Sequence, residues 1–215
     1  MSFFFPEGSQ FFFSSTFAAA KTITTLTNAN PAVATSTSHG YIDNDEVLLT
    51  SGWEDATDSV FKVDQSDANT FSLLGLNSVS TDFYPTGSGT GSARLISSWV
   101  QIPQILDIST NGGDARFTTV ELLTRRNSLN IPTGFNAMSM TLTLAHDPDD
   151  ANYQSMVDVS RTLSPVAFKM TLSGGASAYS YGYMSVSEAP SMNRNAVNQV
   201  TAALSFLGRF ISYGS

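Results

Sequence analysis

The 215-residue chain is 41% hydrophobic, enough for the core of one large or two small domains. It has no cysteine, which excludes disulfides, thiolate metal sites and cysteine nucleophiles. No stretch approaches the roughly 18 consecutive apolar residues of a membrane-spanning helix, so we expect no membrane partner. Only 13% of the residues are charged, against about 25% in an average soluble domain, and this predicts extensive burial between subunits.

The formal net charge of −8 is concentrated in one part of the chain. Residues 22–86 carry nine acids and one base, Lys62, whereas the remaining residues carry nine acids and nine bases. Neither part has the basic stripe or patch that direct nucleic-acid binding needs. We therefore expect the acidic part to be a separate, solvated unit.

Residues 1–21 are predicted to form an aromatic N-terminal arm and the first strand. The arm contains two phenylalanine runs, Phe3–Phe5 and Phe11–Phe13. Pro6 and Glu7 interrupt them and no basic region precedes them, so the segment is not typical of a secretory signal peptide.

Residues 22–86 are predicted to form a small acidic β module, a barrel or sandwich. Its short strands at 47–50, 60–63 and 71–74 are separated by stretches rich in Gly, Asn and Asp. Residues 87–94 begin with Gly-Ser-Gly-Thr-Gly-Ser, a composition typical of a flexible linker. No helix follows to present its N-terminus to a phosphate, so the glycines do not indicate a phosphate-binding loop.

Residues 95–215 are predicted to form an antiparallel β-sandwich or barrel with one flanking α-helix. Apolar and polar residues alternate along 138–144, 166–172 and 199–206, as in half-buried strands. Gly174-Gly175 precedes a tyrosine-rich run at 179–183, which indicates a hairpin. Asp147 as N-cap, Pro148 at the first helical position and Pro165 as a stop predict a helix over about 148–163. The fold class is therefore mainly β.

Patterns that carry catalysis or metal binding are weak in this sequence. The two histidines, His39 and His146, are far apart and suit structural roles. Asp43–Glu46 resembles the start of a calcium loop, but Leu48 stands where that loop needs glycine, so a solvated turn is favoured over a Ca²⁺ site. No G-x-S-x-G or H-E-x-x-H motif occurs. We assign no catalytic residue, metal ligand or cofactor and expect no enzyme, although a hydrolase with scattered acids stays a possible alternative.

The order of the C-terminal pieces carries a resemblance to a known family. These pieces are a turn at Pro132–Gly134, a strand at Met138–Leu144, a D-P-x-D step at Asp147–Asp150, and strands at Phe168–Leu172, Gly182–Val186 and Val197–Gly208. Over about Ser98–Tyr213 the chain resembles the tail tube subunits of lambda-like long-tailed bacteriophages (siphophages). The acidic segment resembles a small β module of phage virion proteins, with Asn28–Val33, His39-Gly40, Asp45–Val47 and Asn69–Phe71.

This resemblance implies a structural virion protein, the major tail tube subunit. It implies self-assembly into stacked hexameric rings that form the DNA conduit, with the small β module inserted after the first strand. The implied partners are copies of the chain, the terminator and tape measure proteins, and double-stranded DNA that passes without specific binding. The implied location is the virion tail, after assembly in the host cytoplasm. The alternative is a carbohydrate- or receptor-binding virion module, supported by aromatic residues such as Trp53 and the tyrosines near Tyr181.

The resemblance also implies site residues. The loop at 124–133 corresponds to the long inter-ring loop of the family, so Arg125, Arg126 and Asn127 are candidate inter-subunit contacts, with a solvated pair of arginines as the alternative. A conduit that releases DNA should avoid basic walls. The candidate lumen residues are therefore acids or polar strand positions: Glu121, Glu188, Ser139, Thr141, Thr143, Gln199 and Thr201. Lys169 is the residue that would most contradict a neutral wall, and alternation leaves open which sheet face turns inward.

Overall fold

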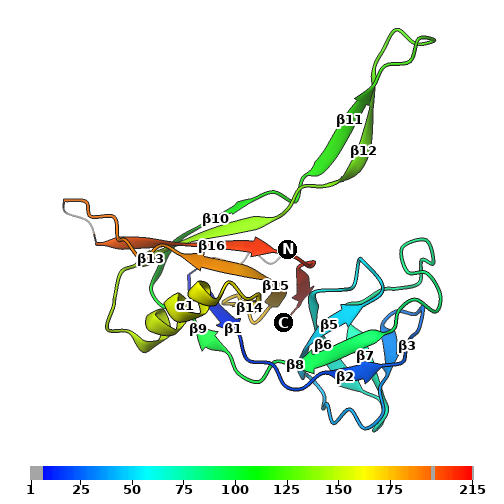
Figure 1. Ribbon diagram of the computed structural model, residues 1–215, viewed down its shortest axis with the longest axis horizontal. Helices are drawn as coiled ribbons and strands as arrows, with labels where there is room; N and C mark the ends of the chain where they lie inside the picture. Colours follow the sequence, from blue (N-terminus) through cyan, green and yellow to red (C-terminus); the bar gives the residue numbers. More distant parts are fainter. Residues whose placement is uncertain (1–6, 195–196, 215) are drawn as a thin grey trace.

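The computed structural model describes residues 7–194 and 197–214 of the chain. These residues build two β units and a long β-hairpin, with one helix packed beside the larger unit (Figure 1). The mainly antiparallel β fold with one flanking helix is thus confirmed. The phenylalanine run Phe3–Phe5 lies outside the described residues.

The larger unit, here called the main barrel, is an antiparallel sheet that curls into a nearly closed barrel. Its strand order is β10 (Ile105–Asn111), β13 (Ser139–Ala145), β16 (Gln199–Phe206), β15 (Ser177–Val186), β14 (Val166–Thr171), β1 (Gln10–Ser14) and β9 (Val100–Gln101), and β17 (Ile211–Tyr213) also pairs with β15. The alternating strands predicted around 138–144, 166–172 and 199–206 are β13, β14 and β16, and the predicted hairpin joins β14 to β15.

The core of the main barrel lies between the sheet and the helix α1 (Ala151–Thr162). Leu142, Leu144 and Ala202 are fully buried on the inner sheet face, and Met156 of the helix is fully buried against them. Burying one such side chain contributes about 1.5–3 kcal/mol, so this face fixes which side of each strand points inward. No helix in the described part of the chain is long and apolar enough to cross a membrane.

The helix begins three residues later than predicted. Its N-cap is Asp150, whose side chain accepts a hydrogen bond from the backbone N–H of Tyr153 at 2.9 Å. Asp147, the predicted cap, instead accepts from the Gln104 side chain at 2.9 Å and lies in the turn before the helix. The helix ends at Thr162, and its C-cap, Leu163, has the left-handed φ of 53°.

The smaller unit, here called the inserted barrel, lies between β1 and β9 in the sequence. Its strand order is β2 (Lys21–Ile23), β8 (Gly91–Leu95), β5 (Glu46–Ser51), β6 (Ser59–Gln65), β7 (Thr70–Leu74), β4 (Ala32–Thr35) and β3 (Thr25–Leu26). The two end strands, β2 and β3, follow each other directly in the chain, so the sheet wraps around a core that contains Trp53 and Phe71. β5, β6 and β7 cover the strands predicted at 47–50, 60–63 and 71–74.

The range predicted as a flexible linker, 87–94, is structured instead. Gly91–Leu95 is β8, which pairs with both β2 and β5. Gly89 is buried, and a Cβ atom there would lie 2.8 Å from the Trp53 ring. A Cβ at Gly91 would lie 1.9 Å from the Thr50 carbonyl oxygen. These glycines therefore permit close packing rather than flexibility, and the last strand of the inserted barrel comes from the predicted linker.

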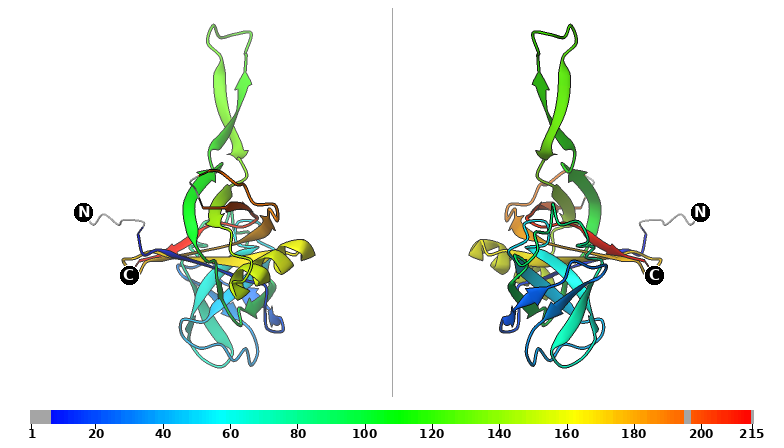
Figure 2. Two further views of the ribbon diagram at one scale, coloured as in Figure 1. Left: turned by 90° about the vertical axis from the view of Figure 1, so that its left-hand side faces the viewer. Right: turned by 90° about the vertical axis from the view of Figure 1, so that its right-hand side faces the viewer.

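The third feature is the hairpin of β11 (Ala115–Val120) and β12 (Leu129–Phe135), which extends the β10 and β13 arm of the main barrel. It projects away from both barrels and ends in the loop 121–128 (Figure 2). The predicted inter-ring loop at 124–133 is therefore the tip and second strand of this hairpin.

Candidate assembly surfaces

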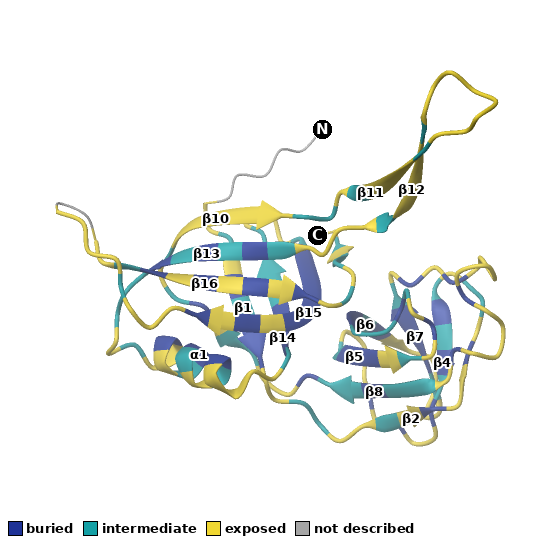
Figure 3. Ribbon diagram, turned by 45° about the horizontal axis from the view of Figure 1, so that its top comes forward, coloured by how far each residue is buried: buried dark blue, intermediate teal, exposed yellow. Residues whose placement is uncertain are grey.

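One face of the main barrel collects the predicted polar strand positions. Thr143 pairs with Thr201, Ala145 with Gln199, and Ser139 with Ser205, while the intervening residues of β13 and β16 point into the core. Burial alternates along both strands (Figure 3). We call this surface the hydroxyl face. Its polar residues are Ser139, Thr141, Thr143, Gln199, Thr201 and Ser205, together with the residues paired to them from β10, which are Asp107, Ser109 and Asn111, and Ala203, which pairs with Thr141, lies among them.

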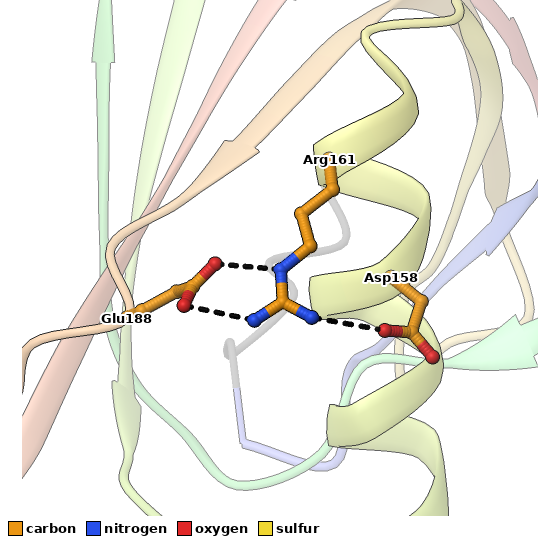
Figure 4. Close-up of polar contacts among 3 residues, drawn as sticks. All are labelled: Asp158, Arg161 and Glu188. Carbon is orange, nitrogen blue, oxygen red and sulfur yellow. Dashed lines mark hydrogen bonds and ion pairs between the residues drawn. The ribbon is translucent and has the colours of Figure 1, made fainter.

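Neither acidic lumen candidate lies among these strand positions. Glu121 follows β11 at the far end of the hairpin. Glu188 follows β15 and accepts two hydrogen bonds from Arg161 of α1, at 2.8 and 2.9 Å (Figure 4). The bonds from Arg161 lower the pKa of Glu188. Proximity in the sequence to a predicted strand therefore did not predict a position on the sheet face, because both acids lie just beyond the ends of strands.

The outer side of β14 and β15 is covered by the inserted barrel. Ala167, Tyr179 and Tyr181 pack against Leu48, Val60 and Ile96 in one buried cluster. The expectation that the acidic segment is a separate, solvated unit is therefore wrong, because apolar residues on both units bury each other. Because the inserted barrel covers their outer side, β14 and the first half of β15 are buried on both faces.

A carboxylate at the centre of this interface joins the two barrels. Glu46 of β5 accepts hydrogen bonds from Trp99 Nε1, from Lys169 Nζ at 2.7 Å and from Tyr179 Oη at 2.5 Å. The side chains of Lys169 and Glu46 are only 24% and 14% exposed. Burial, together with the bond to Glu46, raises the pKa of Tyr179. Lys169 is thus neutralised within the interface and does not reach the hydroxyl face.

The last strand adds a second link between the barrels. Tyr213 of β17 accepts a hydrogen bond from the backbone N–H of Lys62 at 2.9 Å and donates one to the Leu74 carbonyl at 2.7 Å. The Lys62 ammonium lies 5.0 Å from the centre of the Tyr213 ring. Burial raises the pKa of Tyr213 to about 12. Sequence reasoning missed Glu46, Lys62 and Tyr213 as interface residues.

The three predicted contact residues lie together at the hairpin tip. Arg125, Arg126 and Asn127 are all exposed, and no ion pair within the described ranges involves either arginine. Leu123 is 109% exposed, and further apolar side chains are exposed along the hairpin, namely Phe117, Leu122, Ile131 and Phe135. An exposed apolar stretch of this kind marks an interaction surface.

Of the aromatic residues expected to bind carbohydrate, Trp53, Tyr179 and Tyr181 are buried and Tyr183 is 44% exposed. Trp53 is fully buried and donates from Nε1 to the Pro85 carbonyl at 2.8 Å, and Tyr181 is 9% exposed. Both serve packing, one inside the inserted barrel and one at its interface with the main barrel. Trp53 and Tyr181, the two residues named for the receptor-binding alternative, therefore do not support it.

The weak metal-site patterns have structural roles. His39 is buried, with Nδ1 accepting from the Tyr41 backbone N–H at 3.0 Å and Nε2 2.9 Å from the Asp67 carbonyl. Asp43 and Asp45 each accept a hydrogen bond from a backbone N–H, while Glu46 turns to the main barrel. In the part of the chain that the structure describes, no three His, Asp or Glu side chains gather as metal ligands.

The main barrel has a polar outer face on β13 and β16, an outer face on β14 and β15 that the inserted barrel covers, and a projecting apolar hairpin. These features define a structural subunit with surfaces for self-association. The sequence model of the family described as phage tail tube protein, TTP, matches residues 51–215. The chain belongs to the phage tail tube protein family, which confirms the resemblance found in its sequence. It is a structural tail tube subunit, located in the virion tail.

Comparison with solved structures finds the SPP1 tail tube, determined by solid-state NMR and cryo-EM. The two chains are 15% identical, the match covers 55% of this chain and 70% of that chain, and the TM-score is 0.44. No curated protein matches the sequence.

Proposed function

We propose that the subunit assembles into stacked hexameric rings whose channel conducts double-stranded DNA, and that the hydroxyl face lines this channel. The observation that carries the proposal is the register of β10, β13 and β16, which places hydroxyl and amide side chains on one continuous face. Asp107 is the single charged residue among the paired positions of these three strands.

The composition of this face suits a conduit. DNA carries one negative charge per roughly 1.7 Å of helix axis, so basic side chains would bind it and slow its passage. A wall that is mainly Ser, Thr, Asn and Gln, with Ala203 and one acid, offers hydration and weak repulsion. Glu121 and Glu188 leave the proposed wall, because the first lies on the hairpin and the second is paired with Arg161.

The hairpin supports the proposal that rings stack. A two-stranded hairpin is at best marginally stable alone in water, and this one exposes Phe117, Ile131 and Phe135. Packing against neighbouring subunits removes that apolar surface from water. Arg125, Arg126 and Asn127 remain the candidate inter-subunit contacts, at the end of the hairpin.

The remaining assignments follow the family. We propose that the tube is assembled in the host cytoplasm on the tape measure protein, is capped by the terminator protein, and has no enzymatic role. DNA passes through the channel during ejection without sequence-specific contacts.

Electron microscopy of the concentrated, purified protein tests the proposal. We expect hollow rods, and a cryo-EM reconstruction in which six subunits per ring turn Thr141 and Thr201 to the channel. Dispersed monomers at high concentration would contradict self-assembly. Rods whose channel is lined by the helix side would contradict the assignment of the wall.

A further inference from the structure

The hairpin tip combines two kinds of binding group. Leu122 and Leu123 are exposed apolar side chains, and Arg125 and Arg126 follow them directly in the same loop. Leu123 makes no shielding contact, since it is 109% exposed. A tip of this composition fits a receiving surface with an apolar floor and an acidic rim.

The inserted barrel carries a surface of that kind, here called the insert hollow. It has a volume of about 420 Å³ and is lined by Asp55, Val79, Phe83 and Tyr84 of the inserted barrel and by Arg209, from the segment between β16 and β17. Val79 and Phe83 are 59% and 66% exposed, so the apolar part is open to solvent. Asp55 and Arg209 lie 3.6 Å apart and largely satisfy each other.

The free negative charge comes from the residues next to this lining. Glu54 precedes Asp55, and Asp82 precedes Phe83, and both side chains are exposed. Neither takes part in an ion pair within the described ranges. The inserted barrel as a whole is strongly acidic, which adds long-range attraction for a basic tip.

The tip and the insert hollow cannot meet within one chain. The hairpin and the inserted barrel lie at opposite ends of the molecule in both views of Figure 2. A contact between two different patches on identical subunits is heterologous, so it produces a closed ring or an open stack rather than a closed pair, and an open stack is what contacts between successive rings require.

We propose that the hairpin tip of one subunit docks in the insert hollow of a second copy in the adjacent ring. Leu123 contacts Val79 and Phe83, while Arg125 and Arg126 face Glu54 and Asp82. This inference rests on the proposed ring stacking and adds that the inserted barrel is the receptor for the hairpin. The insertion then serves tube assembly.

Cysteine cross-linking tests the contact without interference, because the natural chain has no cysteine. The docking variant combines Leu123→Cys with Phe83→Cys, and it is assembled and treated with a short bismaleimide. We expect a ladder of covalent oligomers on a denaturing gel. The matched control variant combines Leu123→Cys with Ile42→Cys, since Ile42 is also an exposed apolar residue of the inserted barrel, 63% exposed, but lies at the other end of β5 from Asp55.

The possible outcomes separate the two proposals. Rods with a ladder from the docking variant and none from the control variant support the docking. Rods with no ladder from the docking variant, or with equal ladders from both variants, overturn the docking but leave tube assembly standing. If no rods form, tube assembly fails, and the docking is judged on the ladder from concentrated protein in solution, whose absence overturns it.

A charge exchange provides an independent measurement. Arg125→Glu with Arg126→Glu should raise the protein concentration needed for rods about three- to tenfold, as expected for exposed ion pairs. Adding Glu54→Arg and Asp82→Arg should restore most of the loss, because the charges are exchanged across the same contact. The control reversal Asp64→Lys, at an exposed acid on the same barrel, should give no rescue. Equal rescue by the control would contradict the pairing.

Discussion

The two halves of the main barrel's outer surface start from the same sequence pattern and end in different environments. Along β13 and β16 the outward positions are mainly Ser, Thr and Gln, with Ala145 and Ala203 among them, and all are exposed or half-buried. Along β14 and the first half of β15 they are Ala167, Lys169, Tyr179 and Tyr181, and the inserted barrel covers them. Alternation of apolar and polar residues thus identifies the core face, while the size of the outward side chains separates a solvated face from a docking face.

The largest expected difference between the halves is at Tyr179. Tyr179→Ala should lower the free energy of unfolding by about 3–5 kcal/mol, the range for removing a buried aromatic side chain, because the ring is 1% exposed and its hydroxyl binds Glu46. The control is Tyr183→Ala on the same face of the same strand, where the ring is 44% exposed. Urea unfolding measures both, and equal losses would contradict the difference between the halves.

A smaller effect is expected from the carboxylate itself. Glu46→Gln keeps the shape but leaves the Lys169 ammonium without a counter-charge in a site where that side chain is 24% exposed. We expect a loss of about 2–3 kcal/mol, below the range for fully buried pairs because water partly screens this one. Glu54→Gln, at an exposed acid of the same barrel, should change stability by less than about 0.5 kcal/mol. If Glu46→Gln lowered the free energy of unfolding by no more than the control Glu54→Gln, the interface would not depend on this charge pair.

The next prediction concerns the segment that resembles a linker. Gly89→Ala should destabilise the inserted barrel by about 1–3 kcal/mol, the usual cost of overpacking, because the added Cβ would meet the Trp53 ring at 2.8 Å. Ser88→Ala, one residue earlier and exposed, should have little effect. Thermal unfolding followed by the fluorescence of Trp53 and Trp99 measures both. A flexible linker would tolerate the two substitutions equally.

The sequence predicted those parts of the fold that depend on local pattern. The strands of the main barrel, the hairpin after Gly174-Gly175 and the presence of the helix all follow from periodicity and turn residues within a short window. The helix start was wrong because Asp147 and Asp150 are both good caps, and the choice depends on Gln104, far away in the sequence. The Gly-Ser run was misread because glycine serves both flexible chains and close packing, and only Trp53 decides between them.

The candidate site residues also divide into those that a local sequence pattern predicts and those that depend on residues far away in the sequence. The five polar strand positions from Ser139 to Thr201 lie on one face because register follows from alternation. Glu188 was misplaced because its partner, Arg161, lies on the helix. The junction of Glu46 with Lys169 joins positions 123 residues apart, and no local pattern indicates such a pair. The outward tyrosines at 179 and 181 were the one available signal, since large aromatic side chains on the face turned away from the core indicate that this face is covered as well.

The smallest effect on stability, and the sharpest test of the hydroxyl face, is expected from Thr201→Lys. Thr201 is exposed and pairs with Thr143, so the substitution should change the free energy of unfolding by no more than about 0.5 kcal/mol.

In assembled rods, however, each ring of the Thr201→Lys variant would turn several ammonium groups toward passing DNA. Each phosphate contact adds about 0.9 to the slope of log affinity against log salt, so Thr201→Lys rods should retain added DNA at low salt and release it at high salt. The matched variant is Gln154→Lys, which places the same charge at an exposed position of α1, outside the strands that form the hydroxyl face. Filter retention of labelled DNA by purified rods measures the difference. A lysine on the channel wall should retain more DNA than a lysine outside the channel. If the rods of the two variants retained equal amounts of DNA, the hydroxyl face would not line the channel.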